Sequence, residues 1–224
     1  MRHMSQKIEA LIFDLDGTLA DSLGDIGGAM NDVLIELGRQ PHPLSAYKTF
    51  VGEGVEHLVR QATHSEEVQP VPLGDIVARY RQFYRQRNHA SSLPYAGIAE
   101  MLDAMVLRKI PMAVLSNKLD EPTRHLVSHH FARWNFAAVR GERPGVPRKP
   151  DPTAAIEIAQ ALSVPAASIG FVGDTAYDMK AAVAAGMQPI GVLWGFRDRH
   201  ELMSAGAKYL LSHPSELVAI VENP

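Results

Sequence analysis

The sequence contains no cysteine among its 224 residues. The chain can therefore form no disulfide, no Cys-ligated zinc or iron–sulfur site and no thiol nucleophile. Charge of either sign is not in large excess either, because 22 Lys and Arg oppose 25 Asp and Glu, for a formal net charge of −3. Nucleic-acid-binding proteins usually carry a basic excess, so we expect no nucleic-acid partner.

Long apolar runs are also missing. A membrane-spanning helix needs about 18 apolar residues, which no run approaches, and the polar stretch 1–7 is unlike a signal peptide. We therefore expect a cytoplasmic protein with no membrane partner. The sequence leaves open whether it is a monomer or a homodimer. Hydrophobic residues make up 46% and charged residues 21%, which is ordinary for a globular chain. The length predicts one large domain, or one domain with a smaller insert.

Short apolar runs alternate with helical patterns over residues 93–224. Runs typical of buried strands lie at 110–115, 168–172 and 189–193, with another at 8–13 and a weaker one at 136–139. This alternation predicts an α/β core, a Rossmann-like parallel sheet with helices on both faces. Residues 20–92 differ, because their apolar residues recur only at helical spacing, which predicts an all-helical insert.

Polar residues follow the ends of the predicted strands. Asp14, Asp16 and Thr18 follow the run at 8–13, Ser116 and Asn117 follow the run at 110–115, and Asp174 and Asp178 follow the run at 168–172. Lys149 lies in a loop between the runs at 136–139 and 168–172. Ligands of a doubly wound sheet bind beyond the carboxyl ends of its strands. We therefore expect these side chains to converge.

The stretch Asp14-Leu15-Asp16-Gly17-Thr18-Leu19 resembles the signature of the haloacid-dehalogenase-like hydrolase superfamily. The other three motifs of that superfamily follow in order, as Ser116, Lys149 and Gly173-Asp174 with Asp178. The stretches 93–97, 149–152 and 181–187 resemble its phosphoglycolate-phosphatase-like branch. The resemblance covers essentially the whole chain. It implies a phosphoric monoester hydrolase acting on a small phosphorylated metabolite, with 2-phosphoglycolate as the first candidate.

The resemblance assigns a role to each motif. Asp14 would attack phosphorus and form an aspartyl-phosphate, a step that carboxylates can perform. Asp16 would protonate the leaving alcohol and then deprotonate the attacking water. Lys149 would neutralise the phosphate and Asp14. Thr18, Ser116 and Asn117 are assigned to substrate binding, and Asn117 would also help to hold its loop.

Charge counting favours a metal ion at the same place. Four carboxylates oppose the single charge of Lys149, and the incoming phosphate is a dianion, so a divalent cation would offset strong repulsion. Oxygen ligands favour Mg²⁺. The resemblance implies the carboxylates of Asp14 and Asp174 and the backbone oxygen of Asp16 as ligands. Asp178 would not bind the metal directly and would instead orient Lys149 or a metal-bound water.

The resemblance also implies that the insert, residues 20–92, is an α-helical cap on a catalytic core of residues 1–19 and 93–224. Gly52 and Gly54 of this cap would then reach the substrate. Glu53 between them is an awkward neighbour for a doubly anionic substrate such as 2-phosphoglycolate.

Other functions remain open at this point. The same superfamily includes inorganic pyrophosphatases, sugar-phosphate phosphatases and phosphomutases. Gly52-Glu53-Gly54-Val55 stands where the β-phosphoglucomutase-like members carry Gly-x-Ser-Arg, which argues against a mutase. A non-catalytic binding module on this fold is a further alternative. Each motif alone has a plainer explanation, for example Asp174 and Asp178 as a cap and a first-turn acid of a helix.

Overall fold

The computed structural model describes residues 7–63 and 71–222. The chain divides into two compact units, one formed by residues 1–20 with 94–224 and the other by residues 21–93. We call them the core unit and the helical unit. In the part of the chain that the structure describes, no helix is long and apolar enough to span a membrane.

The core unit is built on a six-stranded sheet with the order β5-β4-β1-β6-β7-β8. Its strands are β1 (Ala10–Phe13), β4 (Met112–Leu119), β5 (Phe136–Glu142), β6 (Ile169–Gly173), β7 (Gln188–Val192) and β8 (Tyr209–Leu211). All neighbouring pairs are parallel. The sheet therefore has all its carboxyl ends along one edge.

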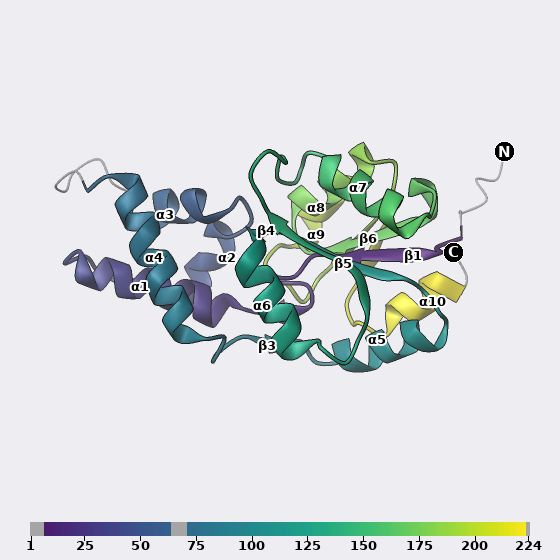
Figure 1. Cartoon of the computed structure of the whole chain (residues 1–224), viewed down its shortest axis with the longest axis horizontal. Helices are drawn as coiled ribbons and strands as arrows, with labels where there is room; N and C mark the ends of the chain where they lie inside the picture. Colours follow the sequence, from purple (N-terminus) through teal and green to yellow (C-terminus); the bar gives the residue numbers. More distant parts are fainter. Residues whose placement is uncertain (1–6, 64–70, 223–224) are drawn as a thin grey trace. The chain divides into compact units, whose positions relative to one another are not determined.

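Helices cover both faces of this sheet (Figure 1). Leu11 and Phe13 of β1 belong to one hydrophobic cluster, and Ala10 and Ile12 belong to another, because successive side chains of a strand point to opposite faces. The first cluster includes residues of α5 (Ile98–Leu107), α6 (Asp120–His130) and α10 (Glu216–Glu222), and the second includes residues of α7 (Thr153–Leu162) and α8 (Ala176–Ala184). The predicted α/β core with a parallel sheet is confirmed.

Strand β4, predicted at residues 110–115, differs from its prediction at both ends. It begins at Met112 rather than at residue 110, because the backbone N–H of Ile110 donates to Met105 O and so completes the end of α5. It continues to Leu119, with a shift of register against β5 after Leu115. The short strand β8 was not predicted, since three residues carry too little pattern to stand out.

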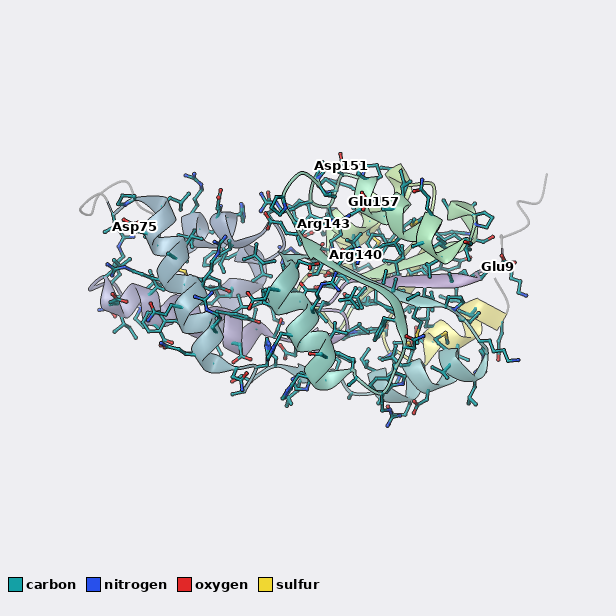
Figure 2. All side chains as sticks on the ribbon, in the orientation of Figure 1. Glu9, Asp75, Arg140, Arg143, Asp151 and Glu157 are labelled. Carbon is teal, nitrogen blue, oxygen red and sulfur yellow. The ribbon has the colours of Figure 1, made fainter. Side chains whose placement is uncertain are left out.

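The remaining elements of the core unit are short. They are α9 (Arg199–Ser204) and the 3-10 turn η2 (Ala166–Ser168). Some charged side chains of this unit lie on its surface, as Figure 2 shows for Glu9 and Glu157, and Arg143 pairs with Glu157 of α7. Such exposed pairs contribute at most about 1 kcal/mol to stability, so they do not determine the fold.

In the described part of the helical unit, residues 21–63 and 71–93, one hydrophobic cluster draws residues from four α-helices. These are α1 (Leu23–Glu36), α2 (Tyr47–Phe50), α3 (Val55–Thr63) and α4 (Leu73–Arg87), with the 3-10 turn η1 (Leu44–Ala46) before α2. Tyr47 is fully buried, and its hydroxyl donates to Asn31 Oδ1 over 2.6 Å. The chain leaves and returns through two short paired strands, β2 (Ala20–Asp21) and β3 (Leu93–Pro94).

Candidate active site

Three neighbouring strands bring polar side chains to the carboxyl edge of the sheet. β1 lies between β4 and β6, so Asp14 after β1, Ser116 in β4 and Asp174 after β6 come from adjacent positions. The backbone N–H of Asp14 donates to Val172 O over 2.9 Å, which extends the pairing of β1 with β6 up to the site. The parallel order thus makes residues that are distant in sequence neighbours in space.

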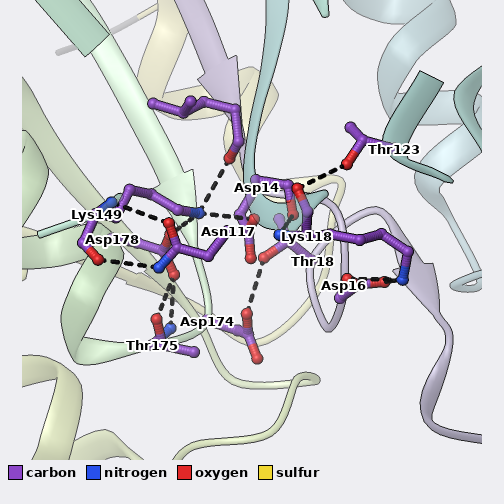
Figure 3. A network of polar contacts seen from close by, with 12 residues as sticks. Asp14, Asp16, Thr18, Asn117, Lys118, Thr123, Lys149, Asp174, Thr175 and Asp178 are labelled. Carbon is purple, nitrogen blue, oxygen red and sulfur yellow. Dashed lines mark hydrogen bonds and ion pairs between the residues drawn. The ribbon is translucent and has the colours of Figure 1, made fainter. Parts of the chain in front are cut away.

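Lys149 is the centre of a buried ion cluster (Figure 3). Its ammonium donates to Asp14 Oδ1 and Asp178 Oδ1, each over 2.7 Å, and to Leu115 O over 3.0 Å. The side chains of Lys149, Asp14 and Asp178 are only 3%, 8% and 0% exposed. An ammonium has three N–H donors, so these contacts use all of them. Lys149 is therefore fixed against Asp14 rather than solvated.

Asn117 holds the backbone of Lys149. Its side-chain Nδ2 donates to Lys149 O, and its Oδ1 accepts from Lys149 N, both over 2.9 Å. This double contact joins β4 to the loop that carries the lysine. Asn117, expected both to bind substrate and to hold its loop, has the second task in this structure.

Asp174 is fully buried and held from two sides. Its Oδ1 accepts from the hydroxyl of Thr18 over 3.2 Å, and its Oδ2 accepts from Phe196 N over 2.8 Å. Gly17 and Gly195 pack so closely that a Cβ on either would fall 2.3 Å from an Asp174 atom. Gly17 also has φ +88°, a conformation that favours glycine. Thr18, expected to bind substrate, here binds Asp174.

Asp178 has two tasks at once. Its Oδ2 accepts from the backbone N–H and the hydroxyl of Thr175, over 3.0 and 2.7 Å, in a capping box at the start of α8. Its Oδ1 accepts from Lys149. Asp178 is thus a first-turn acid of α8 and also a partner of Lys149, because its two oxygens face different partners. Its expected role behind the metal ligands stays a prediction.

Asp16 lies outside this cluster and pairs with Lys118, a residue that the sequence analysis missed. Lys118 Nζ donates to both carboxylate oxygens of Asp16, over 3.0 and 3.1 Å, and the two side chains are 9% and 10% exposed. The expected strand end at residue 115 put Lys118 in a loop. The available signal was a lysine two residues after Ser116, on a strand that in fact continues to Leu119.

Ser116 and the two glycines differ in their placement. Ser116 is buried, and its Oγ accepts from Lys118 N over 3.2 Å, which leaves its O–H able to donate. Gly52 and Gly54 belong to the helical unit, in the turn between α2 and α3, with φ of +130° and +86°. Their expected contact with substrate stays a prediction.

The carboxylates of Asp14, Asp174 and Asp178 are close enough to hold a metal ion, with one oxygen of each lying within 4.8 Å of the others. Burial raises the pKa of Asp14 to about 7, although Lys149 opposes this. Burial, together with the charges of Asp14 and Asp178, also raises the pKa of Asp174 well above its usual range. Burial and mutual repulsion thus disfavour the ionised form of these carboxyl groups. A hard divalent cation, which binds carboxylate oxygens, would stabilise that form.

The pKa of Lys149 is governed by the same neighbours. Burial alone would lower the pKa of its ammonium, but the negative charges of Asp14 and Asp178 outweigh burial and raise it. Lys149 therefore stays protonated. Lys118 adds a second positive charge that the count from sequence omitted, so the site holds four carboxylates and two lysines.

Comparison with known proteins gives the family of this chain. A family model described as haloacid dehalogenase-like hydrolase matches residues 11–192. The phosphoglycolate phosphatase of Photobacterium profundum is 29% identical over 221 residues, which cover 96% of both chains. The phosphoglycolate phosphatase of Pseudomonas fluorescens (strain Pf-5) is 33% identical over 191 residues, which cover 83% of this chain and 70% of the relative.

Solved structures agree with this assignment. A crystal structure from Lactobacillus delbrueckii subsp. bulgaricus superimposes with a TM-score of 0.88 at 26% identity, over 96% of this chain and 99% of that one. CbbY from Rhodobacter sphaeroides, solved in complex with phosphate, shares the fold with a TM-score of 0.80 at 24% identity, over 96% and 99% of the two chains. The resemblance noted from the sequence is confirmed, and the chain belongs to the haloacid dehalogenase-like hydrolase family.

Proposed function

We propose that this protein is a Mg²⁺-dependent phosphatase that hydrolyses 2-phosphoglycolate to glycolate and phosphate through an aspartyl-phosphate. The observation that carries the proposal is the buried contact of Asp14 with Lys149 at the carboxyl edge of the sheet, 2.7 Å between Oδ1 and Nζ. Lys149 holds one oxygen of Asp14 and neutralises charge near it. The other oxygen, Oδ2, is the one that we assign to attack on phosphorus.

The first half of the reaction transfers the phosphoryl group to Asp14. A bond forms between Asp14 Oδ2 and phosphorus while the bond from phosphorus to the ester oxygen breaks. Asp16, two residues further along the same loop, gives its proton to the departing ester oxygen, so that glycolate leaves with a hydroxyl group. The hydroxyl of Ser116 donates to a phosphoryl oxygen.

The second half returns Asp14 to its starting state. Asp16, now ionised, takes a proton from a water molecule, whose oxygen attacks phosphorus. The bond from phosphorus to Asp14 breaks, phosphate leaves, and Asp16 again holds the proton that the next turnover needs. Lys149 stabilises the extra charge on the phosphoryl oxygens in both halves.

Mg²⁺ fits the donor set of this site. We assign the carboxylates of Asp14 and Asp174 and the backbone oxygen of Asp16 as its ligands, the set that the family resemblance implies. Asp178 instead accepts hydrogen bonds from Lys149 and Thr175. When bound, the ion supplies positive charge that lets a phosphate dianion approach the carboxylates. Asp178 acts through Lys149, which it holds in place.

The substrate assignment is supported by the curated relatives, several of which are named phosphoglycolate phosphatase. In this proposal the partner is a small phosphorylated metabolite, and the helical unit serves as the cap, with Gly52 and Gly54 contacting the substrate. A cap that excludes water would strengthen the charge interactions of the site.

The test is a hydrolysis screen with and without Mg²⁺ over 2-phosphoglycolate, sugar phosphates, nucleotides and pyrophosphate, with the Asp14→Asn protein as control. We expect 2-phosphoglycolate to give the highest kcat/KM, and EDTA to abolish turnover until Mg²⁺ is restored. A higher kcat/KM for pyrophosphate or a sugar phosphate would overturn the substrate, and activity that survives exhaustive chelation would overturn the role of the metal.

A further inference from the structure

The ion pair of Lys118 with Asp16 is the part of the site that the proposed reaction does not explain. Both side chains are about nine-tenths buried, and Lys118 Nζ faces both oxygens of Asp16 at 3.0 and 3.1 Å. A buried ion pair often adds little to stability compared with apolar residues of similar size. Its position beside the residue that would protonate the leaving group points instead to a task in the reaction.

The backbone of Lys118 is held firmly in this position. Its N–H donates to Ser116 Oγ over 3.2 Å, and its carbonyl oxygen accepts from the hydroxyl of Thr123 over 3.2 Å. Gly141 of the neighbouring strand β5 packs so closely that a Cβ there would fall 2.6 Å from Lys118 O. The strand end therefore fixes where the lysine side chain starts, as a preorganised binding group requires.

The proposed substrate brings its second charge to the same place. In 2-phosphoglycolate one methylene group separates the carboxylate from the ester oxygen that Asp16 would protonate. Once the ester oxygen lies beside Asp16, the carboxylate arrives at the Asp16–Lys118 pair. A second carboxylate next to Asp16 is repelled unless a cation receives it.

Lys118 is better suited to this task than Lys149. All three N–H donors of Lys149 already bind Asp14, Asp178 and Leu115 O, and moving any of them would break the buried cluster around the nucleophile. The Lys118 ammonium donates to the Asp16 carboxylate, and a substrate carboxylate can replace that carboxylate like for like.

From this placement, and resting on the proposed function, we infer that Lys118 is a specificity-determining residue that binds the carboxylate of the substrate by exchanging it for Asp16. The exchange releases the Asp16 side chain from Lys118, so that binding of the substrate carboxylate and release of Asp16 are one event. The substrates selected are phosphomonoesters with a second negative group one methylene from the ester oxygen. Neutral alcohols lack the group that would release Asp16.

The test compares two substrates that differ only in this group, 2-phosphoglycolate and 2-hydroxyethyl phosphate, in four proteins. These are the wild type, Lys118→Met, Lys118→Arg and Lys180→Met, the last changing an exposed lysine of α8 as a matched control. The readout is the ratio of the two kcat/KM values within each protein. This ratio does not depend on the fraction of protein that is folded, so partial unfolding of a variant does not obscure it.

We expect the wild type and Lys180→Met to prefer 2-phosphoglycolate, and Lys118→Met to lose at least about tenfold of that preference, as removal of a charge-assisted contact predicts. Lys118→Arg should keep most of it. If Lys118→Met slows both substrates by the same factor, Lys118 acts only by positioning Asp16, and the inference is wrong while the substrate assignment stands. If the wild type has no preference, the substrate assignment fails as well.

Discussion

The two units of the molecule bury charge in different ways. The core unit buries four carboxylates and a lysine at one edge of its sheet, where Asp14, Asp174 and Asp178 crowd around one positive side chain. In the described part of the helical unit the only buried carboxylate is Asp25, which is 1% exposed. It accepts from Ser91 N and from the Ser92 hydroxyl, the latter over 2.6 Å, and so holds the first turn of α1 to the segment after α4.

The difference separates a chemical role of buried charge from a structural one. Neutral hydrogen-bond donors stabilise Asp25 without a competing carboxylate. The core carboxylates repel one another, and burial keeps the pKa of Asp14 and of Asp174 high. A protein retains such unfavourable crowding where the groups are needed to react or to bind a cation.

The largest expected effect is that of Asp14→Asn. The amide cannot form the phosphoryl bond, so we expect kcat to fall by about 10⁴-fold or more while the fold is kept. Single-turnover release of phosphate measures the loss, and far-UV circular dichroism checks the fold. A variant that retains more than a small percentage of the wild-type rate would remove Asp14 from the role of nucleophile.

Lys149→Met should have the second largest effect, and on stability as well as on activity. It leaves two buried carboxylates without their cation, which we expect to lower the free energy of unfolding by about 3–5 kcal/mol. Urea titration followed by circular dichroism measures this. Lys180→Met, an exposed lysine of the same unit, is the control, and equal stability of the two variants would contradict the buried cluster.

Asp25→Asn tests the structural side of the comparison. The amide replaces one of the two acceptor oxygens by an NH2 donor, which would face the hydroxyl or the N–H that now donates there, and we expect a loss of about 1–3 kcal/mol in the free energy of unfolding. Turnover per folded molecule should change far less than in Asp14→Asn. Should kcat fall as steeply in both variants, the separation between reactive and structural buried charge would not hold.

The smallest effect concerns pH and metal. Because the folded pKa values of Asp14 and Asp174 are raised, the folded state binds more protons than the unfolded state between about pH 4 and pH 7. In EDTA the free energy of unfolding contributed by these groups should therefore fall as pH rises through that window. Mg²⁺ should offset this loss, so that the rise in Tm on adding Mg²⁺ is larger at pH 8 than at pH 5.5.

Differential scanning calorimetry measures the rise in Tm on adding Mg²⁺ at each pH. In a chain of this length, each kcal/mol of added stability raises Tm by about 2–4 °C. Asp174→Asn supplies the control, because it removes one of the two titrating groups and should reduce the dependence on pH. A rise in Tm that is the same at both values of pH would speak against a cation bound by these carboxylates.

Sequence by itself determined the class of the fold and the residues at the carboxyl edge of the sheet. Apolar runs such as Ala10–Phe13 must be buried on both faces, and the residue that ends such a run is brought to an edge whatever its distant neighbours are. Asp14 and Asp174 could be recognised for this reason, before any contact was known.

Only the tertiary structure decided which side chains meet. Lys118 and Asp16 lie 102 positions apart, and Thr18 and Asp174 lie 156 apart, so neither hydrogen bond leaves a local pattern in the sequence. Asn117 turned toward the backbone of Lys149 because β4 passes beside that loop. Periodicity reports which face of a strand or helix is buried, whereas the partner across a sheet edge depends on strand order and on where each strand ends.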